Sequence, residues 1–182
     1  MYFDVIFAGF GGQGLLMAGD LLAFSYMREG FEITWFPSYG VEMRGGAASC
    51  TVVVSSEKIG SPIVESPQAA ACLSWPALEK FQGKVRQDGL LIVNTSLIDP
   101  QKVSRKDLKI IFLPANKLAM EKLGQIKMAN MIILGALAAA HKNLDFNIIL
   151  NALPAYFAEK KALIALVKQG LLLGQEWLVT NK

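Results

Sequence analysis

A glycine-rich segment near the N-terminus has the residue types and spacing to hold an anion. Gly9, Gly11 and Gly14 follow the pattern G-x-G-x-x-G, and Gly12 and Gln13 lie between the last two glycines. Glycines let the backbone turn tightly and approach a ligand closely, and free N–H groups at the start of a helix point toward negative charge. A pyrophosphate or a carboxylate is the ligand that this segment would hold.

The same spacing is typical of dinucleotide-binding proteins, where an acidic residue near the end of the second strand binds the ribose. Here the corresponding strand ends in Thr34-Trp35-Phe36-Pro37-Ser38, with Glu32 at its start and Glu42 beyond it. NAD binding is therefore disfavoured, and a free-standing dinucleotide-dependent oxidoreductase remains an alternative. A purely structural role also remains open. The glycines, with Gly19, would let a helix pack closely on the sheet, and the Gln13 side chain would form hydrogen bonds with backbone groups of the loop.

A second segment combines polar side chains with glycines in a connection between two expected strands. Its candidate ligand-binding residues are Ser38, Tyr39, Gly40, Glu42, Arg44, Gly45 and Gly46. Loops that follow parallel strands meet at one edge of a sheet, so we expect this segment close to the first. Arg44 is the candidate for a charged contact with an anion, and Tyr39 would stack on a ligand or pack against a partner chain. The alternative is a Glu42–Arg44 contact within a surface turn.

Apolar runs bounded by turn residues predict the elements that position these segments. We expect strands over Tyr2–Ala8, Phe31–Phe36, Ser49–Ser55, Ala69–Ser74, Gly89–Asn94 and Lys109–Leu113. Helices are expected over Leu15–Met27, Pro76–Phe81, Asn116–Leu123, Lys127–His141, Phe146–Phe157 and Glu159–Leu173, with Pro154 kinking or splitting one of them. The alternation predicts an α/β fold: a mainly parallel, layered sheet with a Rossmann-like first strand-loop-helix and a helical C-terminal portion, in one domain over residues 1–182.

Composition narrows the function classes. Hydrophobic residues make up 53% of the 182 and charged residues 18%, so part of the apolar surface is expected to cover a partner. A net charge of +3 is too small to indicate nucleic acid. Cys50 and Cys72 are interpreted as buried thiols, and two cysteines cannot ligate an iron–sulfur cluster alone. No export signal is recognised, and Met131–Ala140 is too short to span a bilayer, so we expect a cytoplasmic protein without a membrane partner.

Three segments resemble the gamma subunits, or equivalent fused domains, of the 2-oxoacid:ferredoxin oxidoreductases. The first runs from Gly9 to Gly14 with Ala18-Gly19, the second from Ser38 to Gly46, and the third from Gly124 through Asn130-Met131 to Gly135. One departure is Val41, where the family has proline. That change frees the backbone of the segment and removes no functional group.

The resemblance implies a complex that oxidatively decarboxylates a 2-oxoacid such as pyruvate, 2-oxoglutarate or 2-ketoisovalerate, forms an acyl-coenzyme A and reduces ferredoxin. Thiamine diphosphate, magnesium and the iron–sulfur clusters would lie on alpha and beta subunits and on a ferredoxin-like delta subunit where one is present. This chain would supply no catalytic residue and no metal ligand, and it would contact coenzyme A through the first two segments. A ligand-free scaffold in the same complex is the alternative, and His141 is interpreted as a helix-end residue.

Overall fold

The computed structural model of the chain describes residues 1–40 and 45–181. Its strands are β1 (Tyr2–Phe10), β2 (Glu32–Tyr39), β3 (Ala47–Ser55), β4 (Ala69–Cys72), β5 (Leu90–Asn94) and β6 (Lys109–Leu113). Its helices are α1 (Leu15–Arg28), α2 (Trp75–Phe81), α3 (Ala115–Leu123), α4 (Ala129–Ala140), α5 (Phe146–Tyr156) and α6 (Ala162–Thr180), with short 3-10 turns η1 (Pro100–Lys102) and η2 (Ile126–Met128).

The strands form one sheet in the order β2-β3-β1-β4-β5-β6. The pairs β1–β4, β4–β5 and β5–β6 are parallel, whereas β3 runs antiparallel to both of its neighbours. β2 is therefore parallel to β1, and the mainly parallel sheet predicted from the sequence is confirmed. The carboxyl ends of β2, β1, β4, β5 and β6 all lie along one edge, which we call the carboxyl edge.

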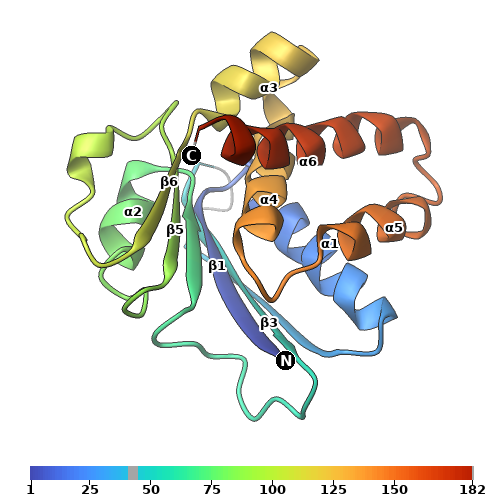
Figure 1. The fold of residues 1–182 in the computed structure, drawn as a ribbon, viewed down its shortest axis with the longest axis horizontal. Coiled ribbons are helices and arrows are strands. Elements are labelled where there is room, and N and C mark those ends of the chain that lie inside the picture. Colours follow the sequence, from blue (N-terminus) through green and yellow to red (C-terminus); the bar gives the residue numbers. More distant parts are fainter. Residues whose placement is uncertain (41–44, 182) are drawn as a thin grey trace.

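Helices cover the two faces of the sheet unequally (Figure 1). Phe3, Val5 and Phe7 of β1 pack into the larger core with α1, α4, α5 and α6, while Ile6 and Ala8 of the same strand pack into a smaller core under α2. This alternation follows from the period of two along a strand. Because α1 and α2 lie on opposite faces, the chain changes direction between β1 and β4, which is where open α/β sheets place their ligands.

Close packing of α6 on α4 holds the helical C-terminal portion together. A Cβ atom on Gly174 would overlap the carbonyl oxygen of Ile132, and one on Gly135 would overlap that of Leu171. Every α4 residue from Ala129 to Ala138 is buried, whereas Ala139 and Ala140 at its end are exposed. By length and composition, α6 is the one helix of the described residues that could cross a membrane, and here it packs on α4.

Several elements differ in their bounds from the sequence predictions. α6 runs over Ala162–Thr180, where Glu159–Leu173 was expected. β2 continues to Tyr39, three residues past its expected end, because Pro37 lies on an edge strand where a missing N–H disrupts no interior ladder. Pro154 does not split α5, which ends at Tyr156. It lies in the last turn of that helix, so few backbone hydrogen bonds remain for it to disrupt.

The α4–α6 contact predicts a sharp difference between two glycines of one helix. Gly174→Ala should lower the free energy of unfolding by about 2 kcal/mol or more. The added methyl group would overlap the backbone of the neighbouring helix, which cannot move aside as a side chain can, and overpacking of this kind costs ~1–3 kcal/mol. At Gly170 an added Cβ would lie 3.0 Å from the Met131 Cβ, which is a tight contact, but 3.7 Å from the nearest backbone atom, so Gly170→Ala should cost clearly less than Gly174→Ala. Urea denaturation of both variants checks this, and equal losses would contradict the assigned contact.

Candidate functional site

Gln13 bridges the carboxyl ends of β1 and β4. Its Oε1 accepts a hydrogen bond from the Phe10 N–H at 2.7 Å, and its Nε2 donates to the Leu73 carbonyl at 3.1 Å. Gly9 makes room for this bridge, because a Cβ there would overlap Gln13 Oε1 and lie 2.9 Å from the Leu73 Cβ. Gly9 and Gln13 therefore shape the turn, and the Gln13 side chain occupies the position between the two strand ends.

The end of the glycine-rich turn is tied to α4. Gly14 adopts a φ of +74°, and Gly12 a φ of +96°, both in the left-handed region that favours glycine. The buried Asn130 amide donates from Nδ2 to the Gly14 carbonyl at 2.9 Å, and a Cβ on Gly14 would lie 2.5 Å from that nitrogen. The first and third of the motifs that carried the family resemblance thus meet in space.

Most N–H groups of the turn are used within the protein. Phe10 donates to Gln13 Oε1, Gln13 donates to the Phe10 carbonyl at 3.2 Å, and Gly11 donates to the Gly46 carbonyl at 2.9 Å. The last contact confirms the prediction that the first two motifs lie together. Only the N–H groups of Gly12 and Gly14 donate to no group in the described part of the chain. Fewer backbone N–H groups are therefore available to an anion than the glycine-rich motif suggested.

A cavity of about 150 Å³ lies beside Gly12. It is lined by Gly12, Gln13, Leu73, Asn116, Ile126, Lys127 and Ala129. Lys127 is the charged residue among them, and the Asn116 side chain is positioned by a 2.7 Å hydrogen bond from the buried Asn94. At about 30 Å³ per water molecule the cavity has room for one phosphate or carboxylate group.

Three helices begin around this cavity, which makes it electropositive. α1, α3 and α4 start at or next to its lining residues, and none has an acidic residue in its first turn. The Ala115 and Lys117 N–H groups of α3 donate to the side chains of Asn94 and Ser96, and the Met131 N–H of α4 donates to Asn130, so α1 has the least capped of the three helix starts. The N-terminal end of a helix carries a partial positive charge, and Lys127 adds a full one. Sequence reasoning missed Lys127 and Asn116, because only the fold brings them beside the glycine-rich turn.

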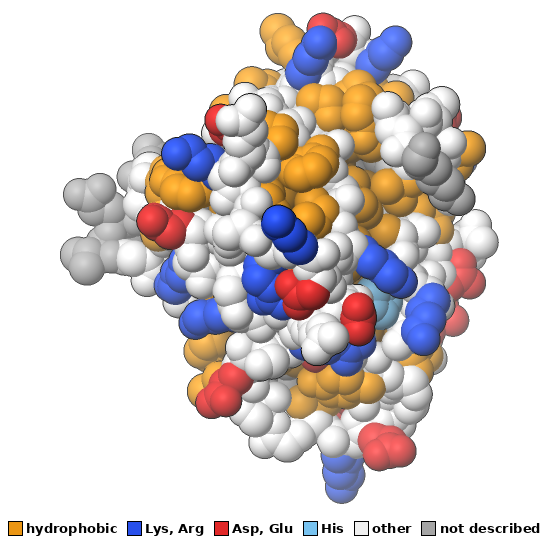
Figure 2. All heavy atoms as spheres, turned by 60° about the vertical axis from the view of Figure 1, so that its left-hand side comes forward, with side chains coloured by type: hydrophobic (Ala, Val, Ile, Leu, Met, Phe, Trp, Pro, Cys, Tyr) orange, Lys and Arg blue, Asp and Glu red, His pale blue; other side chains and the backbone are white. Residues whose placement is uncertain are grey.

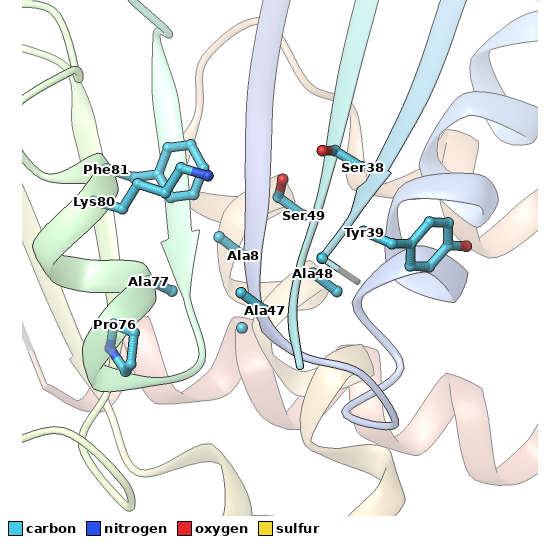
Figure 3. Close-up of a pocket in the computed structure, with 12 residues that line it drawn as sticks. Ala8, Ser38, Tyr39, Ala47, Ala48, Ser49, Pro76, Ala77, Lys80 and Phe81 are labelled. Atoms are coloured by element: carbon cyan, nitrogen blue, oxygen red, sulfur yellow. The ribbon is translucent and has the colours of Figure 1, made fainter. Parts of the chain in front are cut away.

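A second cavity, of about 140 Å³, lies on the α2 side of the same edge and includes Gly9, Tyr39 and Gly40. Lys80 and Phe81 extend from α2 toward the strands, with Ser38 and Ser49 across the cavity, while the Tyr39 ring points away from Lys80 (Figure 3). The Lys80 ammonium lies 5.2 Å from the centre of the Phe81 ring, in a cation–π contact. Lys80 was not recognised from the sequence.

The predicted site residues divide into four groups. Gly9, Gly11, Gly12, Gln13 and Gly14 form the turn, and Ser38, Tyr39 and Gly40 line or flank the α2-side cavity. Gly45 and Gly46 lead into β3, where Gly46 contacts the turn. Glu42 and Arg44 lie outside the described residues, so their predicted contacts with an anion remain predictions.

Other reactive side chains lie away from this edge or are shielded. Within residues 1–40 and 45–181, no group of three or more His, Cys, Asp or Glu side chains could hold a metal ion. Burial raises the pKa of the Cys50 and Cys72 thiols to about 12. His141 follows α4, and its ring contacts that of Phe3 at a tilt of 52°, at the opposite edge of the sheet. Burial and then nearby Arg and Lys side chains lower the pKa of His141, so a helix-end role fits its position.

The fold and the site together define an α/β domain with a basic, glycine-lined edge at the carboxyl ends of its parallel strands. The chain belongs to the pyruvate ferredoxin/flavodoxin oxidoreductase family, whose model matches residues 4–177. The resemblance inferred from the three sequence motifs is thereby confirmed.

The chain is similar in sequence to known oxidoreductase subunits. It is 37% identical over 175 residues to the ketoisovalerate oxidoreductase subunit VorA of Methanothermobacter marburgensis, and the match covers 96% of this chain. The chain spans only 36% of that relative's length.

Two solved structures share the fold. The gamma subunit of a keto/oxoacid ferredoxin oxidoreductase from Geobacter sulfurreducens aligns over 98% of this chain and 99% of its own, with a TM-score of 0.83 and 24% identity. A 2-oxoglutarate:ferredoxin oxidoreductase from Magnetococcus marinus, with 2-oxoglutarate, coenzyme A and succinyl-CoA bound, aligns over 100% of this chain and 32% of its own, with a TM-score of 0.87 and 22% identity.

The Asn130 contact predicts that the turn depends on α4. Asn130→Ala should lower the free energy of unfolding by about 1–3 kcal/mol, the usual cost of losing a buried hydrogen bond. Asn143→Ala is the matched control, since its Nδ2 also donates to a backbone carbonyl, that of Tyr2 at 3.0 Å, but in an exposed contact. Denaturation of both variants measures the difference, and an Asn130→Ala loss no larger than the control's would refute the coupling.

The cysteine pKa values predict slow thiol chemistry in the folded chain. A thiol with a pKa of about 12 is almost entirely protonated at pH 8, and the thiolate is the reactive form. Native protein should react with Ellman's reagent at pH 8 far more slowly than free cysteine, and both thiols should react at once in urea. Rapid reaction of either thiol in the native state would contradict the burial described for Cys50 and Cys72.

Proposed function

We propose that this chain is the gamma-type subunit of a 2-oxoacid:ferredoxin oxidoreductase complex and that its carboxyl edge contributes to binding coenzyme A. The complex would cleave the bond between the carboxylate and the oxo carbon of the substrate, release carbon dioxide, transfer the acyl group to coenzyme A and pass electrons to ferredoxin. Family membership over residues 4–177 supports the assignment to the complex. The observation that carries the ligand role is the basic cavity between Gly12 and Lys127.

Coenzyme A suits this edge chemically. Its pyrophosphate and 3′-phosphate are anions, and the edge offers the Gly12 and Gly14 N–H groups and the starts of α1 and α4. Lys127 and Lys80 add positive charge on either side of the turn. The Magnetococcus relative of the same fold was solved with coenzyme A bound, which supports coenzyme A over a dinucleotide. β2 also ends without the acidic residue that dinucleotide-binding proteins use to bind the ribose, which again favours coenzyme A over a dinucleotide.

The reacting groups of the complex would lie on other chains. Thiamine diphosphate, held with magnesium, would supply the nucleophile for the oxo carbon, and iron–sulfur clusters would supply the route for electrons, on alpha, beta and ferredoxin-like delta partners. This chain would orient coenzyme A for acyl transfer through the turn and its lysines. We assign the substrate only to the 2-oxoacid class, and we place the complex in the cytoplasm, where thiols such as Cys50 and Cys72 stay reduced.

Lys127 provides the test of the ligand role. In the assembled complex, Lys127→Ala should raise the half-saturation concentration of coenzyme A by about three- to tenfold, since charge-assisted hydrogen bonds contribute ~1.5–3 kcal/mol when shielded and less when exposed. Turnover at saturating coenzyme A should stay near wild type. Steady-state reduction of ferredoxin by the purified complex, at varied coenzyme A, measures both quantities.

The control is Lys142→Ala, which removes a lysine near His141 at the opposite edge of the sheet. It should leave the half-saturation concentration unchanged. If Lys127→Ala behaves like this control while the complex assembles and turns over normally, the chain is a ligand-free scaffold and the coenzyme A role is wrong. If the chain joins no such complex in the native cell, the whole assignment fails.

A further inference from the structure

Two asparagines connect the end of β5 to the cavity beside Gly12. Asn94 is the last residue of β5 and is 1% exposed, and Asn116 belongs to the first turn of α3 and lines the cavity. The Asn94 Oδ1 accepts a hydrogen bond from the Ala115 N–H at 3.2 Å, and the Asn94 Nδ2 donates to the Asn116 Oδ1 at 2.7 Å. The buried Asn94 side chain therefore joins the sheet to one wall of the cavity.

The backbone determines which end of each amide faces which partner. The Ala115 N–H can only donate, so the Asn94 atom that it meets must be the oxygen. The Asn94 side chain then turns its NH2 group toward Asn116, and the atom that it meets there must also be the oxygen. Rotating either amide by half a turn would set two donors against each other, at the cost of an unsatisfied buried polar group. One backbone N–H thus fixes the orientation of two side chains.

This orientation leaves Asn116 with donors only. Its Oδ1 faces Asn94, and its Nδ2 donates to no group in residues 1–40 and 45–181. The Ala115 and Lys117 N–H groups donate to Asn94 and Ser96, whereas the Asn116 N–H between them donates to no group in the same described ranges. The Asn116 Nδ2 is therefore the side-chain atom that is available to a ligand in the cavity.

The other groups around the cavity match this polarity. The Gly12 N–H and the Lys127 ammonium are also donors, and no acidic side chain is among the lining residues. The acceptors of Gln13 and Leu73 are already engaged, since Gln13 Oε1 accepts from a backbone N–H and the Leu73 carbonyl accepts from Gln13 Nε2. An ionised phosphate group presents only acceptor oxygens. The cavity therefore suits a phosphate better than a group that must donate.

Apolar surroundings strengthen a correctly oriented neutral donor. Figure 2 shows the side of the molecule that carries α2 and β6. Hydrophobic side chains gather in its upper half, the direction in which the parallel strands end, whereas charged side chains cluster around His141 below them. Leu73 and Ile126 add apolar groups to the cavity wall itself. A hydrogen bond in such surroundings is electrostatically stronger than in water, so the orientation of one amide affects ligand affinity.

We propose that Asn116 is a specificity-determining residue, which binds a phosphate group of the ligand through its Nδ2, and that Asn94 is the positioning residue that holds Asn116 in the donor orientation. This inference rests on the proposed function, because it takes coenzyme A as the ligand. Coenzyme A carries phosphate in its pyrophosphate and at its 3′ position, and the cavity of about 150 Å³ has room for one such group.

Asn116→Asp tests the donor without changing the shape of the side chain. One carboxylate oxygen still accepts from the Asn94 Nδ2, and the other replaces the proposed donor with a negatively charged acceptor. The dissociation constant of coenzyme A should rise by at least about tenfold, since a charge-assisted hydrogen bond is lost and a like charge is added. Isothermal titration calorimetry of the assembled complex, without 2-oxoacid, measures it. The half-saturation concentration of coenzyme A in ferredoxin reduction should rise in parallel, with turnover at saturation near wild type.

Asn94→Asp tests the positioning role, because Asn94 is not among the residues that line the cavity. Both oxygens at position 94 would then be acceptors, so the Asn116 amide would rotate to donate to one of them and would present its Oδ1 to the cavity. The dissociation constant of coenzyme A should rise by about three- to tenfold, the effect of losing one hydrogen bond to a charged group.

The matched control is Asn143→Asp, which makes the same change of charge at an exposed asparagine beside Tyr2, at the opposite edge of the sheet. Coenzyme A should bind this variant within about twofold of wild type, because solvent screens so distant a charge. Circular dichroism checks that each variant folds. A merely structural role of Asn116 would leave Asn116→Asp indistinguishable from this control, since the contact with Asn94 is kept.

Dephospho-coenzyme A, which lacks the 3′-phosphate, identifies the phosphate that Asn116 binds. If the loss of affinity in Asn116→Asp disappears with this ligand, the cavity holds the 3′-phosphate. If the loss persists, the cavity holds the pyrophosphate. Either result supports the inference.

The remaining outcomes separate this inference from the proposed function. If Asn116→Asp binds coenzyme A as tightly as wild type while Lys127→Ala binds it more weakly, this inference is wrong and the proposed function stands. If neither variant changes the affinity of the assembled complex for coenzyme A, the ligand role of the chain fails, and this inference fails with it.

Discussion

The hydrogen bond from the Asn130 side chain to the Gly14 carbonyl is the contact on which the arrangement of the site depends. It joins the turn after β1 to the start of α4 across 116 residues of chain, at a distance of 2.9 Å. Because Asn130 is buried, nothing in the solvent replaces this bond when it is lost. It brings the cavity residues at the start of α4 beside Gly12, so the basic edge exists only when the C-terminal helices are packed on the sheet.

The glycines of the chain serve two different purposes. At Gly14 and Gly12 the left-handed backbone conformation turns the chain from strand into helix. At Gly135 and Gly174 the absent side chain lets α4 and α6 approach until backbone meets backbone. The second set stabilises the helical layer that supports Asn130, and the first set shapes the turn whose Gly12 and Gly14 N–H groups we propose as donors to an anion. The fold therefore connects helix packing far from the edge to the geometry of the edge itself.

Local sequence patterns were sufficient for the elements and for the first turn. Strand, glycine turn and helix follow one another over Tyr2–Arg28, and the alternation of later elements predicted the mainly parallel sheet. What the patterns could not show was which N–H groups the protein uses internally, because Gly11 bonds to Gly46 and Gln13 bonds to Leu73, 60 residues away. Nothing near Lys80 or Lys127 in the sequence marks either as a candidate site residue, since a lysine on a helix or turn is usually solvated. Their role follows from topology, which brings the ends of distant strands together.

The central claim is that this chain supplies part of a coenzyme A site at its carboxyl edge. A structure of the native complex with coenzyme A bound, determined by electron cryomicroscopy, tests it most directly. The account predicts a coenzyme A phosphate within hydrogen-bonding distance of the Gly12 N–H or the Lys127 ammonium. Coenzyme A bound entirely by other chains, with the carboxyl edge of this chain facing solvent, would contradict it.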